Sequence, residues 1–396
     1  MNEQTLKTAT IERDWKLFET AVFLFAFGFA IYTVVFVNYI SNILLLGPTR
    51  MGLLETFREI PGLLAVGLAG IAASYMETKV GAVCLILSAV GVAATGLAHS
   101  FIPLVIVTVF WSIFMHQWFT TSSAIPIALA SGKESGRHLG RMGKIGAFAT
   151  IFAFLSVRLI TFLLHNYVPF EAYFLAAGAF ILAGGLMLTP ISAHASTTNR
   201  PRLLYRKEYR TYYWLTFLEG CRRQIFTTFA IFALVYQYRA PEQHIALLML
   251  FNAVATFYVA APAGKLVDRW GEKKTMTLYY IGIALAFTGY AVTKSVSALM
   301  ILYVIDNMLF SLGVSITTYL NRITRPGELM PSLSMGQTMN HIAAVIIPVT
   351  GGLLWSKFGY HAPFWAGVAA ALVSLFITRT FVPAHNTVSA NETAAV

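Results

Sequence analysis

The sequence contains a short charged run, Glu219-Gly220-Cys221-Arg222-Arg223-Gln224, inside a long hydrophobic stretch. On a helix, Glu219 meets the two arginines at spacings of three and four residues, so one guanidinium is expected to be neutralised within the helix. The other arginine needs a different partner. We expect Arg222 to reach a polar cavity, where Asp306 or an anionic ligand group would neutralise it. In the alternative interpretation, both arginines form fixed ion pairs that hold helices together.

A second charged run, Glu55-Thr56-Phe57-Arg58-Glu59-Ile60-Pro61-Gly62, lies in another hydrophobic stretch. Its three charged residues share one face of a helix, and Pro61 is expected to bend that helix beside them. Such a cluster could form a gate that breaks and re-forms between two states, or it could hold a carboxylate that carries a proton. A fixed ion pair with Arg158, which lies in a different hydrophobic stretch (145–164), is the simpler alternative.

Further polar residues inside hydrophobic stretches are candidates for a solute site. Two of them are histidines, His116 and His341. A histidine inside a membrane span can carry a proton, donate a hydrogen bond or bind a metal, although many such histidines are packing residues. Asp306 is the first candidate for ion coupling, because an isolated buried acid gains most from protonation. The substrate-binding candidates are Arg222, Arg223, Asn38, Trp111, His116, Gln117 and Asn307. The candidates for proton coupling or ion pairing are Asp306, Glu219, Glu59, Glu55, Arg58, Arg158 and His341.

Twelve hydrophobic stretches must position these residues. The chain is 57% hydrophobic and only 11% charged, with a mean hydropathy of +0.67, which excludes a soluble domain of 396 residues. Each stretch is near or above the ~20 residues that a helix needs to cross a bilayer, and strands of a membrane barrel would be about half as long. The stretches are 17–45, 51–75, 80–98, 101–129, 145–164, 170–191, 213–236, 245–267, 275–292, 297–319, 333–355 and 363–382.

The second six stretches follow the first six at an offset of roughly 195 residues. Gly70 corresponds to Gly264, and the pair Met142-Gly143 corresponds to Met335-Gly336. The sequence therefore predicts an all-α membrane protein of twelve transmembrane helices in two pseudo-symmetric bundles. Its predicted parts are an N-terminal bundle, 1–191, a basic cytoplasmic linker, 192–212, and a C-terminal bundle with a short tail, 213–396.

Basic residues alternate between the loops and predict the orientation in the membrane. Twenty lysines and arginines lie in the loops on one side, and only Arg50, Arg239, Lys294 and Lys357 lie on the other. Because positive loops are translocated poorly, both termini are expected in the cytoplasm, and a bacterial inner membrane is the expected location. The net charge of +11 is spread over these loops and does not form a nucleic-acid surface. The first stretch is too long for a signal peptide, so it is expected to remain as a helix.

Motifs for catalysis and cofactors are missing from the sequence. Nucleotide-binding loops, zinc-protease signatures, serine-hydrolase elbows and paired cysteine motifs do not occur, so we expect neither an enzyme nor a bound cofactor or resident metal. The two cysteines, Cys84 and Cys221, fall in different stretches and predict no disulfide framework.

One loop carries a specific motif, Gly264-Lys265-Leu266-Val267-Asp268-Arg269-Trp270-Gly271-Glu272-Lys273-Lys274, on the side expected to be cytoplasmic. It resembles the G-x-L-x-D-R-x-G-x-K/R signature of the major facilitator superfamily, whose secondary transporters have two six-helix halves. The resemblance implies a conformational latch formed by Gly264, Asp268, Arg269, Gly271 and Lys273, with the glycine at position 264 allowing two helices to approach closely. The matching segment of the first half keeps Gly70 but lacks the Asp-Arg pair.

The resemblance also implies that the first, fourth, seventh and tenth helices line a central cavity, while the third, sixth, ninth and twelfth face lipid. The charges fit this arrangement, because away from their ends the latter four stretches contain no Asp, Glu, Lys, Arg or His. The signatures of many drug and proton antiporters are missing from the fourth and fifth stretches, which makes a multidrug exporter a poorer fit.

These observations predict a secondary transporter that alternates between inward-open and outward-open states, with proton coupling as a secondary hypothesis. Four arginines and four acids inside the stretches nearly balance, and we favour a small organic anion or zwitterion as the substrate. One alternative is a divalent-metal transporter that uses Cys221, His341 and His116. Another is a membrane sensor or scaffold that transports nothing.

Overall fold

The chain is described by a computed structural model that covers residues 3–72, 76–129, 135–164, 168–191, 204–325 and 327–384. These residues form helices and contain no strand, so the predicted all-α architecture is confirmed. Most of the predicted linker, 192–203, and the end of the predicted tail, 385–396, lie outside the described residues. The chain forms two compact units, and each is described by itself.

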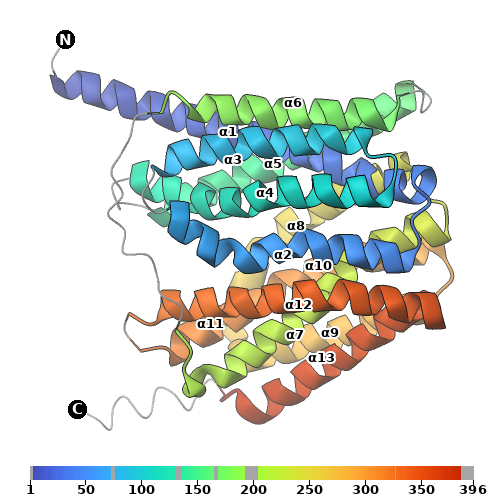
Figure 1. Ribbon diagram of the computed structural model, residues 1–396. Coiled ribbons are helices and arrows are strands. Elements are labelled where there is room, and N and C mark those ends of the chain that lie inside the picture. The colour runs from blue at the N-terminus through green and yellow to red at the C-terminus, as the bar shows by residue number, and fades with distance from the viewer. Residues whose placement is uncertain are drawn as a thin grey trace, which may run out of the picture. The chain divides into compact units, whose positions relative to one another are not determined.

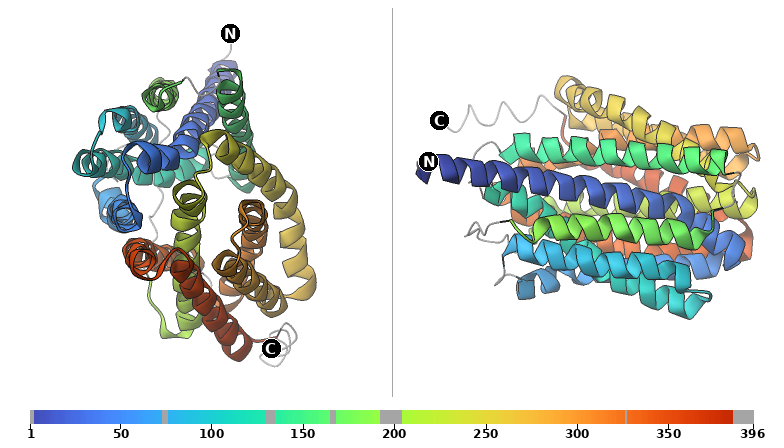
Figure 2. Two further views of the ribbon diagram at one scale, coloured as in Figure 1. Left: turned by 90° about the vertical axis from the view of Figure 1, so that its right-hand side faces the viewer. Right: turned by 90° about the horizontal axis from the view of Figure 1, so that it is seen from above.

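Unit 1 comprises residues 1–46, 57–198 and 240–250. Its main helices are α1 (Glu3–Asn38), α2 (Pro48–Ala72), α3 (Glu77–Ala94), α4 (Phe101–Leu129), α5 (Ser135–Leu163) and α6 (Phe170–Leu188). The first turns of α2 belong to unit 2. Figure 1 shows α1, α3, α4 and α6 running lengthwise beside one another, and the view from above in Figure 2 shows the same for α1 and α6.

Unit 2 comprises residues 47–56, 199–239 and 251–396. Its main helices are α7 (Arg210–Phe232), α8 (Glu242–Trp270), α9 (Glu272–Val292), α10 (Val296–Phe310), α11 (Val314–Ile323), α12 (Leu329–Phe358) and α13 (His361–Phe381). The first turns of α8 belong to unit 1. A short 3-10 turn, Ser311–Gly313, joins α10 to α11, and together they form one long span, Val296–Ile323.

Most of these helices are long and apolar enough to cross a membrane. Among the described residues, nine helical segments meet that requirement, and α8, which is bent by 42°, is a tenth if its two parts count as one span. The two main helices outside this set, α2 and α7, are those that contain the charged runs around Glu59 and Arg222. In α7, the charged residues Glu219, Arg222 and Arg223 account for this exclusion.

The internal duplication extends from packing to backbone conformation. In unit 1, α1 packs on α5 and α6, and α3 packs on α4 and α6; in unit 2, α7 packs on α12 and α13, and α9 packs on α10 and α13. Both α1 and α7 end in a five-residue π-helical segment, Tyr39–Ile43 and Ala233–Gln237. Just beyond these segments, Leu45 (φ 51°) and Arg239 (φ 56°) are the described non-glycine residues with a positive φ. The domain boundaries proposed from the sequence remain a prediction.

Glycines let the helices of unit 1 pack closely. An added Cβ on Gly178 of α6 would lie 2.7 Å from the Cβ of Ala93 and 2.8 Å from the carbonyl oxygen of Ala89, both on α3. Lipid provides little hydrophobic drive for helix association, so close van der Waals contact must hold such helices together.

Replacing Gly178 by Val should therefore destabilise the fold by about 1–3 kcal/mol, because the larger side chain must push α3 away from α6. Thermal unfolding of the detergent-purified protein measures this effect. Gly143→Val is the matched control, because an added Cβ at this exposed position of α5 meets nothing within 4 Å. Equal melting temperatures for the two variants would show that the contact is not important.

Candidate functional site

A buried cluster of charged and phenolic side chains lies within unit 2. It consists of Glu219 and Arg222 on α7, Tyr279 on α9 and Asp306 on α10, and we refer to it as the acid–arginine cluster. Arg222 Nη2 donates to Glu219 Oε1 at 2.7 Å, and Arg222 Nη1 donates to Asp306 Oδ2 at 3.1 Å. The Tyr279 hydroxyl donates to the same Glu219 oxygen at 2.7 Å. The Arg222 side chain is only 3% exposed, so these groups replace the water that its charge would otherwise require.

Local sequence explains how this cluster assembles. Glu219 and Arg222 are three residues apart on α7 and therefore share one helix face. Gly220 lies between them, and an added Cβ there would be 3.1 Å from the Cα of Asn340, so α12 can pack directly on the back of α7. The tight turn from α9 to α10 ends at Ser295, whose hydroxyl accepts a hydrogen bond from the Ala298 amide and caps α10.

The cluster contains two carboxylates but only one guanidinium. With every group ionised, it carries one excess negative charge in a buried setting. Two of its atoms, Glu219 Oε2 and Arg222 Nε, have no hydrogen-bond partner among the described residues. The Arg222 guanidinium lies 5.2 Å from the Phe310 ring centroid and 5.7 Å from that of Tyr279, so aromatic faces supply part of its environment.

The neighbouring Arg223 differs from Arg222 in its surroundings. Arg223 is exposed, and its guanidinium lies 5.9 Å from the Phe310 ring. No ion pair to Arg223 is found in the part of the chain that the structure describes. Of the two partners expected for Arg222, Asp306 is the one found, and Glu219 of the same helix also pairs with Arg222, so Arg223 is the open cation. The reason is geometric, because successive residues on a helix point about 100° apart.

Asn307 follows Asp306 on α10 and is half-buried. Its Nδ2 donates to the Tyr303 carbonyl oxygen at 2.9 Å, within the same helix. The Tyr303 ring stacks on Phe226 of α7 at 4.8 Å. These contacts tie α10 to α7 beside the acid–arginine cluster.

A second polar cluster lies in unit 1, between α2 and α4. Arg58 Nη2 and Glu59 Oε1 form an ion pair at 2.8 Å, and the Ser112 hydroxyl donates to the Arg58 carbonyl oxygen at 2.5 Å. His116 Nδ1 lies 2.9 Å from the Ser112 carbonyl oxygen, and its Nε2 lies 3.8 Å from Glu59 Oε2. The sequence candidates Arg58, Glu59 and His116 are thus brought together. Glu55 is buried and belongs to unit 2, as does His341.

Three proposed substrate-binding residues of unit 1 are buried in its interior. Trp111 is 1% exposed, and its ring packs edge-on against Phe29 and Tyr32 at 6.1 and 5.4 Å. Gln117 is also buried. Asn38 is fully buried, and its Nδ2 donates to the Ala240 carbonyl oxygen at 2.9 Å. Trp111 and Asn38 therefore have structural contacts where an open binding surface was expected.

An ion pair between Arg158 and Glu59 is not found among the described residues. The Arg158 guanidinium lies 5.4 Å from the ring of Phe162, one turn along α5. Its Nη1 is buried without a hydrogen-bond partner among the described residues. Glu59 is paired with Arg58 on its own helix, which leaves the cation–π contact as the interaction seen for Arg158.

The predicted latch loop connects α8 to α9. Gly271 has φ 76° and ψ 165°, a conformation that a side chain would strain, and it reverses the chain between the two helices. Glu272, the next residue, forms an ion pair with Arg322 at the end of α11 at 2.7 Å. Asp268 and Arg269 are exposed. An added Cβ on Gly264 would meet no atom within 4 Å among the described residues, so the close helix approach expected there is not seen.

Beyond the membrane spans, Glu328 anchors the start of the second half. The Tyr209 hydroxyl donates to Glu328 Oε2 at 2.7 Å, and Arg206 forms an ion pair with the other oxygen. These two hydrogen bonds lower the pKa of Glu328 below its ordinary value of 4.5. Residues 204–209, part of the predicted basic linker, therefore belong to unit 2.

Several residues of these sites escaped the sequence analysis. Tyr279 lies on the ninth stretch, which the resemblance places against lipid. Phe310 is one of many aromatic residues in hydrophobic stretches, and nothing in the sequence distinguishes it. Glu272 could have been found, because an acid directly after a helix-ending glycine suits the positive end of the next helix dipole.

Replacing Arg222 by Met should destabilise the fold by about 3–5 kcal/mol, because it leaves two carboxylates facing each other without a cation. The double change Arg222→Met with Asp306→Asn should recover part of that loss. Thermal unfolding of the purified proteins measures both effects. Arg223→Met, at the adjacent exposed position, is the control and should change little. A stable Arg222→Met protein would contradict the charge assignment.

Glu328→Gln should lower the melting temperature at pH 7, and this difference should shrink as the pH falls. The pKa of Glu328 is lowered in the folded state, so its ion pair contributes stability above the unfolded value and loses it as the pH falls through the folded value. Melting curves of both proteins between pH 7 and about pH 4 test this. A difference that is independent of pH would show that charge is not the cause.

Known proteins resemble this chain in sequence and in fold. A sequence profile of the Major Facilitator Superfamily matches residues 212–395. A stretch of 114 residues is 28% identical to the tetracenomycin C resistance and export protein of Streptomyces glaucescens, and it covers 28% of this chain and 21% of that protein. The chain thus matches about a fifth of the length of that relative.

Solved structures share the fold over nearly the whole chain. The nucleoside transporter NupG aligns with a TM-score of 0.75 at 14% identity and covers 92% of this chain and 98% of its own. A bacterial homologue of the iron transporter ferroportin has a TM-score of 0.74 at 14% identity, with 93% and 98% covered. A D-xylose-proton symporter has a TM-score of 0.67 at 15% identity, with 95% and 99% covered. The chain therefore has the fold of these solved transporters, and its second half matches the Major Facilitator Superfamily profile.

Proposed function

We propose that the protein is a secondary transporter that carries a small organic anion or zwitterion across a cell membrane. The observation that carries this proposal is the contrast between two adjacent arginines. Arg222 is buried and paired with two carboxylates, whereas Arg223 is exposed beside Phe310 and has no ion pair among the described residues. A guanidinium offers planar paired donors to a carboxylate or phosphate, which supports an anionic group on the solute.

Asp306 is the residue that we propose for proton coupling. Its oxygens lie 3.1 and 3.4 Å from Arg222 Nη1, whereas Glu219 receives a 2.7 Å hydrogen bond from Arg222 and another from Tyr279. Asp306 is thus the less strongly held of the two carboxylates. One proton on Asp306 would cancel the excess negative charge of the cluster and weaken its attraction for Arg222. Such a change would loosen α10 from α7.

The transport cycle that we propose is an exchange between inward-open and outward-open states. Two units with the same internal packing pattern support this cycle, because each can move as one body. The loop at Gly271 would act as the conformational latch. The Glu272–Arg322 ion pair gives this loop a fixed attachment within unit 2. Lys273, Asp268 and Arg269 would contribute to the latch from the surface.

Both termini are proposed to lie in the cytoplasm of a bacterium, with the protein in the inner membrane. The distribution of basic residues supports this orientation. The alternative of a divalent-metal transporter that uses Cys221, His341 and His116 is not supported at Cys221. Among the described residues, Cys221 belongs to no group of three possible metal ligands.

Proteoliposomes test the proposal once a solute has been found by a thermal-shift panel of small carboxylates, phosphates, amino acids and nucleosides. Arg223→Gln should raise the KM for an anionic solute about tenfold or more, because a charge-assisted hydrogen bond is worth roughly 1.5–3 kcal/mol. Asp306→Asn should abolish the dependence of uptake on a pH gradient at clamped voltage.

Arg210→Gln is the matched control, since this exposed arginine lies on the same helix at its first residue. Its KM should equal that of the unmodified protein. An unchanged KM for Arg223→Gln would rule out the anion anchor. Wild-type uptake that ignores the pH gradient would rule out proton coupling and leave the solute assignment standing.

A further inference from the structure

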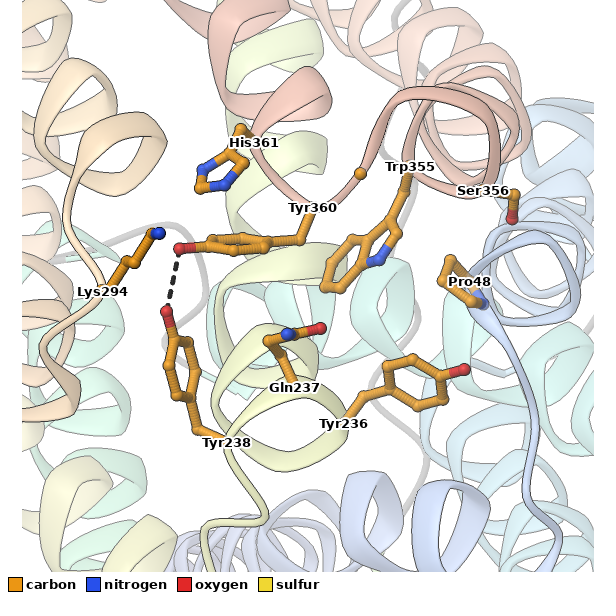
Figure 3. A pocket seen from close by; sticks show the side chains of 10 residues that line it. Pro48, Tyr236, Gln237, Tyr238, Lys294, Trp355, Ser356, Tyr360 and His361 are labelled. Carbon is orange, nitrogen blue, oxygen red and sulfur yellow. Dashed lines mark hydrogen bonds between the residues drawn. The ribbon is translucent and has the colours of Figure 1, made fainter.

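A cavity of about 740 Å³ opens at one end of unit 2, away from the acid–arginine cluster. Figure 3 shows that side chains from several helix ends converge on it. The aromatic residues of its wall are Tyr236, Tyr238, Trp355 and Tyr360. Its polar lining also includes Lys294, His361, Gln237 and Ser356. We refer to it as the aromatic pocket. Its size falls within the roughly 300–1,000 Å³ that is typical of small-molecule sites.

Three turns of the chain build this pocket. The π-helical segment Ala233–Gln237 ends α7 and presents Tyr236. Gly359, with φ 87° and ψ 169°, reverses the chain between α12 and α13 and places Trp355 and Tyr360 on either side of the turn. The short connection between α9 and α10 provides Lys294. All three turns lie at the end of unit 2 that the basic-residue pattern predicts to be extracellular.

Hydrogen bonds and ring contacts hold the wall of the pocket in place. The Tyr360 hydroxyl donates to the Thr293 carbonyl oxygen at 2.9 Å, so the Tyr238 hydroxyl donates to Tyr360 at 2.8 Å. Figure 3 shows this tyrosine pair. Trp355 packs edge-on against Phe232 at 5.2 Å and is 5% exposed. The aromatic surfaces are therefore fixed before any ligand arrives, which reduces the entropy that binding would cost.

The lining of the pocket contains a positively charged residue and no negatively charged one. Lys294 is exposed and has no ion pair among the described residues, and none of the residues that line the pocket is an acid. Burial and the hydrogen bond with Tyr238 raise the pKa of Tyr360, so its phenol stays neutral and adds no negative charge. His361 contributes a buried Nδ1 without a hydrogen-bond partner among the described residues. A cation and an imidazole thus lie beside fixed aromatic rings.

We propose that the aromatic pocket binds a small aromatic carboxylate from the extracellular side. Its ring would contact the tyrosine and tryptophan faces, and its carboxylate would pair with the Lys294 ammonium group. Neutral aromatic compounds would lack the ionic partner, and aliphatic acids would lack the ring contacts. The pocket is separate from the acid–arginine cluster, so this inference stands whether or not the protein transports an anion.

Equilibrium dialysis of radiolabelled benzoate against the full-length protein in detergent tests the pocket, with benzamide as the neutral probe. Benzoate should bind saturably and more tightly than benzamide. Lys294→Gln should weaken benzoate binding about tenfold, as expected for the loss of one charge-assisted contact. Gln237→Arg, which adds a second cation to the lining, should strengthen it; a gain of affinity cannot arise from misfolding.

Two controls locate the site. Lys357→Gln removes an exposed cation at the same end of unit 2 but outside the lining, and it should leave the affinity unchanged. Arg223→Gln should also leave it unchanged, because that arginine lies beside the acid–arginine cluster. The proposal is overturned if wild-type protein shows no saturable benzoate binding, if Lys357→Gln weakens binding as much as Lys294→Gln, or if Arg223→Gln abolishes it.

Discussion

The structure of unit 2 depends on the neutralisation of charges that the membrane cannot solvate. An ion inside hydrocarbon is costly, so Glu219, Arg222 and Asp306 must find one another across α7 and α10. The Tyr279 hydroxyl adds a fourth member from α9. Three helices are therefore fixed by a set of contacts whose loss would expose charge to an apolar medium. The same contacts leave one carboxylate in excess, and this imbalance gives the cluster a reason to respond to protons.

The two units use the same packing pattern but place their polar chemistry differently. In unit 2 the buried charges join α7, α9 and α10, whereas in unit 1 they join α2 and α4 through Arg58, Glu59 and His116. The shared helix arrangement provides the scaffold, and the side chains determine what each half can bind. A shared fold leaves the solute to be decided by individual residues.

Much of the fold could be predicted from the sequence, because hydrophobic length and repeated spacing are local properties. The pairing of Arg222 with Asp306 was also accessible, since two lone charges in hydrocarbon need each other. Which of the two arginines, Arg222 or Arg223, is the open cation could not be predicted. It depends on the direction in which each side chain leaves α7 and on where α10 packs, and a linear sequence contains neither. The burial of Trp111 could not be predicted for the same reason. An aromatic residue near a histidine gives the same sequence pattern whether it lines a cavity or packs in a core.

The backbone bends in the same way just beyond α1 and α7. Leu45 and Arg239 share a left-handed conformation that costs a residue with a side chain roughly 1 kcal/mol or more. Their side chains have nothing in common, and glycine would relieve the cost at either site. Because both halves have the same unfavourable bend after a π-helical turn, the bend belongs to the repeated helix arrangement and not to the side chains at either site. The two halves therefore share the path of the main chain at a place where their side chains differ.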